Sequence, residues 1–141
     1  MKVTLETNSI IANISEELSN LPKSIESQQK TILQKSAKII KKNVELNLPK
    51  SDLGATATNY DGTPYTHMRD DVKATIKDDK AGTVYVVIHG GKKTGFKWHM
   101  LENGTSNSKA IHFIDKAMKQ SESEIDKYID DAIARAVNGG N

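Results

Sequence analysis

The first third of the chain places apolar residues at the spacing of one helical face. They recur at steps of three, four or seven residues, which is typical of an amphipathic helix. Pro22 lacks the N–H that a helix interior needs, so we expect two helices within residues 8–47, one from about Ser9 to Asn20 and one over Ser24–Leu46. The residues of the stripe are Ile11, Ile14, Leu18, Leu21, Ile25, Ile32 and Ile39.

The length of the second helix raises the question of what its apolar stripe contacts. A helix of about 25 residues is ~38 Å long, and a compact chain of this size has a similar diameter. The helix therefore spans the domain or projects from it. Two interpretations stay open: the stripe packs on the sheet of the same chain, or part of it contacts another subunit.

The middle of the chain changes from a loop pattern to strand patterns. Residues 48–66 are small, polar and rich in turn formers, which predicts a long loop of the kind that is usually either functional or disordered. Apolar and polar residues alternate over Val72–Lys77, and Thr83–His89 is apolar on both faces, so a hairpin with one central strand is expected. Gly90–Gly95 is predicted to be a mobile, basic loop.

The last third has the clearest amphipathic pattern, which predicts a helix over residues 111–137. The order of helices, strands and a final helix offers no strand–helix–strand alternation, so it favours an α+β fold. We expect one domain over 1–141, in which a small antiparallel sheet packs with a long N-terminal helix and a C-terminal amphipathic helix. The stripe of the last helix is Ile114, Ala117, Met118, Ile125, Tyr128, Ile129, Ala132, Ile133 and Ala136.

Composition narrows the classes of protein. The 141 residues include 20 basic and 18 acidic ones, a net charge of +2, and no cysteine. The absence of cysteine excludes disulfides and thiolate sites, and the small net charge argues against a surface built mainly to bind phosphate backbones. The start of the chain lacks the features of a secretory signal, and no apolar run approaches the ~18 residues of a membrane span. We therefore expect a soluble protein made in a reducing compartment.

No pattern in the sequence predicts a catalytic, cofactor or metal site. The spacing around Gly91 and Lys92 does not fit a phosphate-binding loop, because Lys93 stands where Ser or Thr is required. His99 and Glu102 are three residues apart and would share a helix face, but we interpret them as a surface pair rather than metal ligands. The remaining histidines do not complete a set of metal ligands, and we interpret the pairs of adjacent acids as solubilising residues. These residues are His67, His89, His112, Asp70-Asp71, Asp78-Asp79 and Asp130-Asp131.

Aromatic and basic residues near position 98 allow a second interpretation. Phe96, Lys97 and Trp98 have the chemistry to stack on and hold single-stranded nucleic acid. Packing of Trp98 in the core or in an interface is the alternative.

The segments Trp98–Thr105 and Ala110–Ala117 resemble a neck protein family of long-tailed bacteriophages. Its members are called tail-completion, tail-to-head joining or head-tail connector proteins. The resemblance extends roughly from Ile25 to Ala136, and its distinctive part is an aliphatic pair followed by Glu-x-Gly-Thr. Asn103 stands where the family usually has an aromatic residue, and His112 stands where it has Pro.

The resemblance implies a non-enzymatic virion protein without a cofactor, made in the cytoplasm of the bacterial host. Copies would form a ring at the head-proximal end of the tail and join it to the head, in contact with tail-tube and head-connector proteins. Neither a membrane nor a specific nucleic-acid sequence would be a partner, and cyclic symmetry would use a head-to-tail interface. The implied interface and elbow residues are Lys92, Lys93, Trp98, Glu102, Gly104 and Thr105.

Residue chemistry suggests what the elbow does. Gly104 can adopt a backbone conformation closed to other residues, and Thr105 can cap the turn. We hypothesise that Glu102 holds the elbow by accepting hydrogen bonds from backbone N–H groups. The alternative function is a small nucleic-acid-binding module that uses Lys92, Lys93, Lys97 and Trp98.

Overall fold

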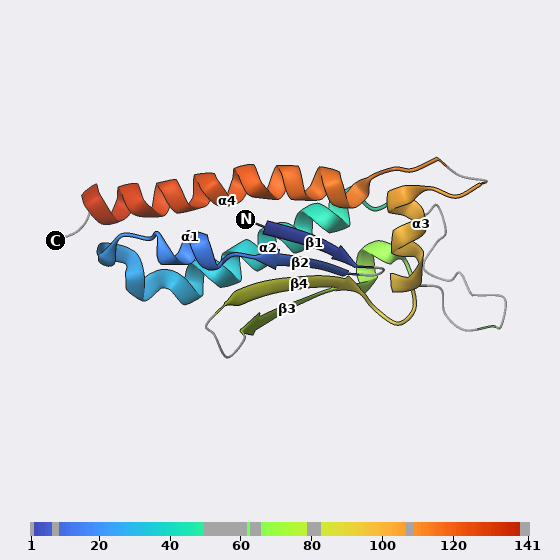
Figure 1. Ribbon diagram of the computed structural model, residues 1–141, viewed down its shortest axis with the longest axis horizontal. Helices are drawn as coiled ribbons and strands as arrows, with labels where there is room; N and C mark the ends of the chain where they lie inside the picture. The colour runs from blue at the N-terminus through green and yellow to red at the C-terminus, as the bar shows by residue number, and fades with distance from the viewer. Residues whose placement is uncertain are drawn as a thin grey trace.

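An antiparallel sheet is covered on one face by two helices that pack against each other (Figure 1). The computed structural model describes residues 2–6, 9–49, 62, 66–78, 83–106 and 109–138. The strands lie in the order β1-β2-β4-β3, and every neighbouring pair is antiparallel, which confirms the predicted α+β class. The elements are β1 (Lys2–Glu6), β2 (Ser9–Asn13), α1 (Ser15–Ser19), α2 (Gln29–Asn47), β3 (Val72–Asp78), β4 (Val84–Gly90), α3 (Trp98–Asn103) and α4 (Phe113–Asn138).

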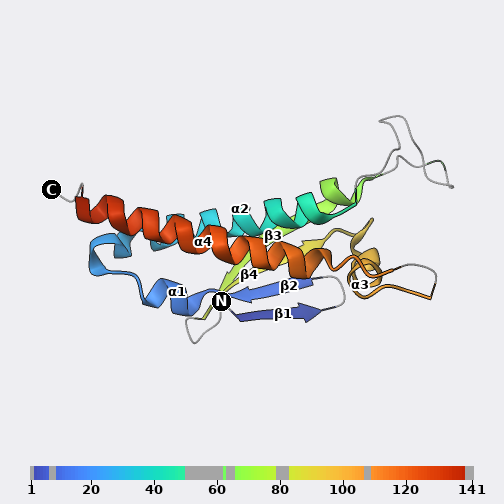
Figure 2. The ribbon, with the colours of Figure 1, turned by 90° about the horizontal axis from the view of Figure 1, so that it is seen from above.

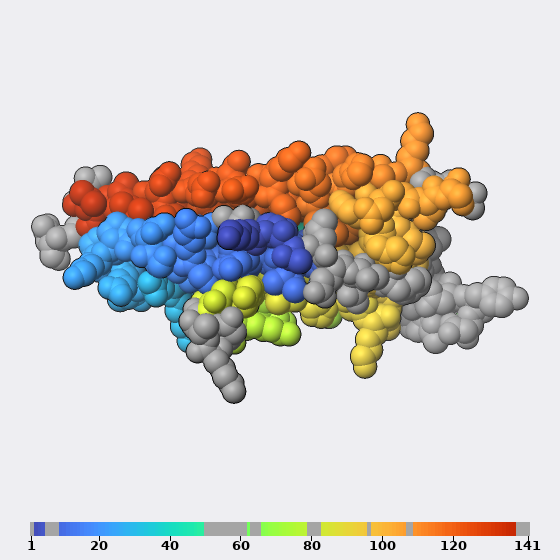
Figure 3. Space-filling model, in the orientation of Figure 1, coloured from blue at the N-terminus to red at the C-terminus, as the bar shows by residue number. Residues whose placement is uncertain are grey.

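The two central strands supply the sheet's share of the core. Ile10 lies opposite Ile88 and Ala12 lies opposite Val86, and all four side chains are fully buried. Residues opposite each other in a sheet point to the same face, so this is the face that the helices cover. Figure 3 shows α4 along the length of the molecule, with β1, β2 and α1 packed beside it.

The prediction of a helix from Ser9 to Asn20 is wrong for its first half. Ser9–Asn13 is strand β2, and only Ser15–Ser19 forms a helix, α1. The spacing from Ile11 to Ile14 fits a helix as well as the alternation of Ile10 and Ala12 fits a strand. The segment forms a strand because it pairs with β1 on one side and with β4 on the other, although β4 lies more than seventy residues later in the chain. β1 itself was not predicted.

The second predicted helix is shorter than its pattern suggested. Lys23–Gln28 is a 3-10 helix after Pro22, and α2 follows with 19 residues, or about 28 Å. Its apolar side chains Ile32, Ile40 and Val44 are fully buried within the chain. The stripe therefore packs on its own sheet and on α4, and the length argument for a contact with another subunit fails.

A buried polar contact fixes how α2 and α4 meet. The amide of Asn43 donates hydrogen bonds to Ser121 Oγ (3.0 Å) and Glu124 Oε1 (3.2 Å), and Ser121 Oγ donates to the Ala117 carbonyl (2.7 Å). Ser121 is fully buried, although it is not part of the apolar stripe from which this helix is predicted. Small polar groups at this crossing satisfy one another, so one relative position of the two helices is favoured.

A 3-10 helix at Met68–Asp71 closes the end of α2. The guanidinium of Arg69 donates from Nε to the Leu48 carbonyl (2.8 Å) and from Nη2 to the Leu46 carbonyl (3.2 Å). Carbonyl groups at a helix end have no partner within the helix, and a basic side chain satisfies them. The chain that enters the hairpin is thereby anchored to α2.

The hairpin and the last helix agree with the sequence patterns. The strands predicted at Val72–Lys77 and Thr83–His89 are observed as β3 and β4, and the helix predicted for 111–137 is α4. The loop predicted for 48–66 lies almost entirely outside the described residues, and the extent of a single domain over 1–141 stays a prediction. Among the helices of the described segments, none has both the length and the apolar character needed to cross a bilayer.

Candidate functional site

The elbow is the connection around Glu102 and Gly104 that joins α3 to α4. It lies at the end of the molecule away from the C-terminus (Figure 1). Glu102 is 5% exposed and its carboxylate lies over the first turn of α4. It accepts hydrogen bonds from the Ile114 N–H (3.2 Å to each oxygen) and the Asp115 N–H (3.3 Å). The hypothesis that Glu102 binds backbone N–H groups is confirmed.

These contacts have a clear physical reason. The first N–H groups of a helix have no partner inside it, and the N-terminus carries a partial positive charge. The carboxylate of Glu102 accepts hydrogen bonds from these N–H groups, and its negative charge is attracted to the helix N-terminus. These interactions compensate for the cost of burying the carboxylate away from water. Glu102 is therefore not half of a surface pair with His99, and that interpretation is wrong.

Gly104 provides the bend that lets α3 present Glu102 to α4. Its φ of 80° and ψ of 172° lie in a region of backbone space that is essentially restricted to glycine. The Gly104 N–H donates to the Met100 carbonyl (2.8 Å), and the returning chain is held by the Ile111 N–H on the Leu101 carbonyl (2.8 Å). The prediction that Gly104 adopts a conformation closed to other residues is confirmed.

Two neighbouring residues complete the connection to α4. His112 directly precedes the helix with a positive φ of 50°, which the ring of proline cannot adopt. The Pro that the resembling family has at this position would therefore not fit the backbone of this chain. Thr105 lies exposed just after Gly104, and its capping role stays a prediction.

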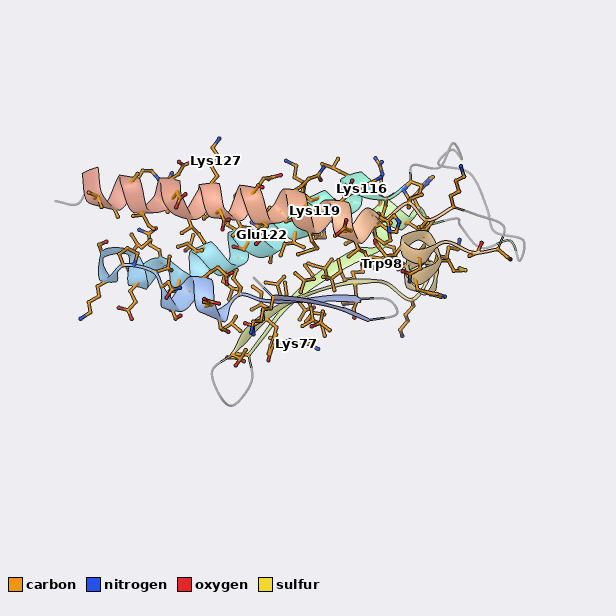
Figure 4. All side chains as sticks on the ribbon, turned by 45° about the horizontal axis from the view of Figure 1, so that its top comes forward. Lys77, Trp98, Lys116, Lys119, Glu122 and Lys127 are labelled. Atoms are coloured by element: carbon orange, nitrogen blue, oxygen red, sulfur yellow. The ribbon has the colours of Figure 1, made fainter. Side chains whose placement is uncertain are left out.

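Trp98 belongs to the core rather than to an exposed surface. Its side chain is fully buried and meets Phe113 edge to face, with ring centroids 5.3 Å apart. Figure 4 shows Trp98 on α3, between the sheet and the start of α4. It cannot stack on a base or touch a partner without local unfolding, so its predicted place in an interface is corrected. It supports the elbow from inside.

The Lys92-Lys93 turn is held in place rather than projecting freely. The Asp71 carboxylate accepts hydrogen bonds from the Thr94 N–H (3.0 Å) and hydroxyl (2.8 Å), and the Gly91 N–H donates to the Asp71 carbonyl (2.7 Å). A Cβ at Gly91 would overlap the Asp71 carboxylate. The turn is thus anchored at Gly91 and Thr94 and presents the exposed side chains of Lys92 and Lys93, and its mobility stays a prediction.

Close backbone contact explains the other glycines of this turn. A Cβ at Gly90 would overlap Gly95 Cα, and a Cβ at Gly95 would lie 2.8 Å from the Gly90 carbonyl oxygen. Only glycine allows the end of β4 and the start of the next helical turn to approach this closely. Asp71 and Gly95 have structural roles that the sequence pattern did not reveal. These roles can be recognised only once the β3–β4 register brings residues 71 and 94 together.

The histidines do not assemble into a metal site in the part of the chain that the structure describes. There, no group of three or more His, Asp or Glu side chains is placed to hold an ion. His99 is exposed on α3, while the nearest acid in sequence, Glu102, is engaged by α4.

Comparison with protein families identifies the family of the chain. Residues 12–104, more than half of the 141-residue chain, match the family described as "Bacteriophage HK97-gp10, putative tail-component". The chain belongs to this family. The match runs from β2 to Gly104 and so includes α2, the hairpin and the glycine of the elbow. Comparisons with curated proteins and with solved structures gave no match.

Membership in this family agrees with the resemblance found in the sequence. A phage tail component is a structural protein of the virion and contacts other phage proteins.

Proposed function

We propose that copies of this protein form a ring at the head-proximal end of a phage tail and join the tail to the head. The role is structural, and no catalytic step is assigned to any residue. The partners are further copies of the chain and the proteins of the tail tube and the head connector.

The observation that carries this proposal is the family match over residues 12–104. A tail component can act along the tube, at its tip or at its head-proximal end. The Glu-x-Gly-Thr elbow and the order of the elements favour the last of these, because they resemble the neck proteins of long-tailed phages.

The geometry of the elbow suits a subunit that must keep its shape in an assembly. Buried hydrogen bonds of Glu102 and the glycine-only backbone of Gly104 fix α3 against α4. Exposed Lys92 and Lys93 lie on an anchored turn and are proposed to contact a neighbouring protein together with Thr105. A preorganised contact surface costs less ordering on association.

The alternative of a nucleic-acid-binding module is not supported by a specific observation. It needs Trp98 as a stacking platform beside Lys92 and Lys93, and the Trp98 ring is fully buried.

Electron microscopy of particles produced without this chain tests the proposal. We expect filled heads and finished tails that remain separate, with joined particles restored when the wild-type chain is supplied. Joined particles in the absence of the chain would contradict the proposal. Short or missing tails would also contradict it, because they would assign the chain to building the tail.

A further inference from the structure

A groove between α2 and α4 is lined mainly by lysines. It has a volume of about 380 Å³, with Ile39 and Tyr128 as its apolar lining. Four lysines against two acids leave the groove with a net charge of +2. The charged side chains are Lys35, Lys38, Lys42, Lys127, Glu124 and Asp131.

The lysines of α2 act as one surface. Lys35, Lys38 and Lys42 follow one another at three and four residues, so they share a face of the helix, and all are exposed. None of them takes part in an ion pair within the described ranges. Their charge is therefore available to a partner.

A second groove, between α1 and α4, has the opposite character. Its volume is about 340 Å³, and no lysine or arginine lines it among the described residues. Its acidic side chains are those of Glu17, Asp126 and Asp130, and its apolar lining comes from Leu21, Ile129 and Ile133.

The two grooves flank the same stretch of α4 on opposite sides. At about 100° per residue, Lys127 and Asp131 point to the side of α2, whereas Asp126 and Asp130 point to the side of α1. Figure 2 shows α4 lying between α1 and α2, and in Figure 3 α1 and α4 are adjacent on the face in view. One side of the molecule thus presents a positive groove and the other a negative one.

We infer that a second copy of this chain occupies each groove, so that the basic α2–α4 groove of one subunit meets the acidic α1–α4 groove of the next. The argument is charge complementarity between two different surfaces of one chain. Contacts between different surfaces repeat head to tail and close into a ring when the rotation permits. The inference rests on the proposed function in that copies of the chain contact one another.

Charge alone does not hold such a contact together. An exposed ion pair contributes little to the free energy of association, so the apolar lining of both grooves must add to it. The opposite charges mainly orient the subunits and exclude contacts between like surfaces. Salt should therefore weaken the association by screening these charges.

The lack of cysteine allows a direct test by disulfide crosslinking. Two full-length chains, one with Lys38→Cys and one with Asp126→Cys, are purified, mixed and oxidised. We expect the mixture to give several-fold more linked dimer than either chain alone, because position 38 meets position 126 rather than another position 38. Lys77→Cys, exposed on β3 away from both grooves (Figure 4), replaces Asp126→Cys in the control mixture.

Charge reversal then tests the cause of the contact. Lys42→Glu in the Lys38→Cys chain should lower the dimer yield several-fold, and Asp130→Lys in the Asp126→Cys chain should restore it. Lys77→Glu makes the same charge change outside the grooves and should leave the yield unchanged. The inference would be overturned if the mixture gave no more linked dimer than the control mixture. It would also be overturned if most dimers joined two Lys38→Cys chains. Retention of DNA by the basic groove without any 38–126 link would overturn it too.

The inference and the proposed function can fail separately. Particles that need this chain for joining, yet join normally when it carries Lys38→Glu and Lys42→Glu, would refute the inference and leave the function intact. Particles that join without the chain would refute the function, whatever the crosslinking shows.

Discussion

At the scale of single residues, backbone conformation and buried carboxylates define the end of the molecule where α3 meets α4. Gly104 adopts φ and ψ values that other residues avoid, and Glu102 lies inside the bend that Gly104 creates. Neither feature depends on an exposed surface. Both can therefore be tested in the isolated chain.

Gly104→Val should destabilise the fold and prevent joining. A β-branched residue forced into this region of backbone space costs about 1–3 kcal/mol, so we expect a lower free energy of unfolding in urea and fewer joined particles. Asn103→Val places the same side chain at an exposed neighbouring position and is the control. Unchanged stability together with normal joining in the Gly104→Val variant would remove the reason for singling out the elbow.

Glu102→Gln should weaken the start of α4. The amide keeps one acceptor but loses the negative charge at the helix N-terminus, which we expect to lower the free energy of unfolding by about 1–2 kcal/mol. Urea denaturation near neutral pH measures the change. Glu122→Gln removes the same charge from an exposed position of α4 and should change stability by less than about 0.5 kcal/mol. Equal effects of the two variants would argue against a capping role.

Asp71→Asn should release the Lys92-Lys93 turn. An amide accepts weaker hydrogen bonds than a carboxylate and brings N–H donors beside those of Thr94, so the turn loses its anchor. We expect faster tryptic cleavage after Lys92 or Lys93 than in the wild type. Asp70→Asn, at the exposed adjacent position, should leave the cleavage rate unchanged. The same rate in both variants would show that Asp71 does not hold the turn.

The two aspartates also show what the sequence could not reveal at this scale. Asp70 and Asp71 are adjacent and chemically identical, and both were interpreted as solubilising residues. Only the register of β3 against β4 places Asp71, and not Asp70, beside Gly91 and Thr94. The roles of Glu102 and Gly104 could be predicted, because residue type and local order suffice for them.

At the scale of elements, patterns long enough to repeat predicted the structure and short ones did not. The last helix repeats its apolar stripe over many turns, and the β3–β4 hairpin is local in sequence, so both were predicted correctly. β2 has five residues, and its partners β1 and β4 include a strand far along the chain. Ile10 and Ala12 alternate as in a strand, whereas Ile11 and Ile14 have the spacing of a helix, and non-local pairing determined the outcome.

The crossing of α2 and α4 is where element packing can be measured. Asn43→Ala and Ser121→Ala each remove one partner of the buried hydrogen bond, and the double variant removes both. We expect a coupling energy of about 0.5–1.5 kcal/mol from a double-mutant cycle in urea. Ser123→Ala, exposed on α4, replaces Ser121→Ala in the control cycle. A coupling energy of zero for Asn43 and Ser121 would show that their hydrogen bond does not help to position the helices.

At the scale of the whole molecule, the surfaces proposed for association lie toward one end of the fold and along both sides of α4. The elbow and the anchored turn lie toward one end, and grooves of opposite charge lie on the two sides of α4. Membership in a phage tail-component family gives these surfaces a setting in the virion. The family could be recognised from sequence order alone, whereas the paired grooves required α1, α2 and α4 to be placed in space.

The most direct measurement of the central claim is electron cryomicroscopy of the mature particle at a resolution that separates helices and strands. The account predicts a ring of density between the head connector and the tail tube, into each unit of which the β1-β2-β4-β3 sheet with α2 and α4 fits. Density for this fold elsewhere in the particle, or its absence from infectious particles, would contradict the account.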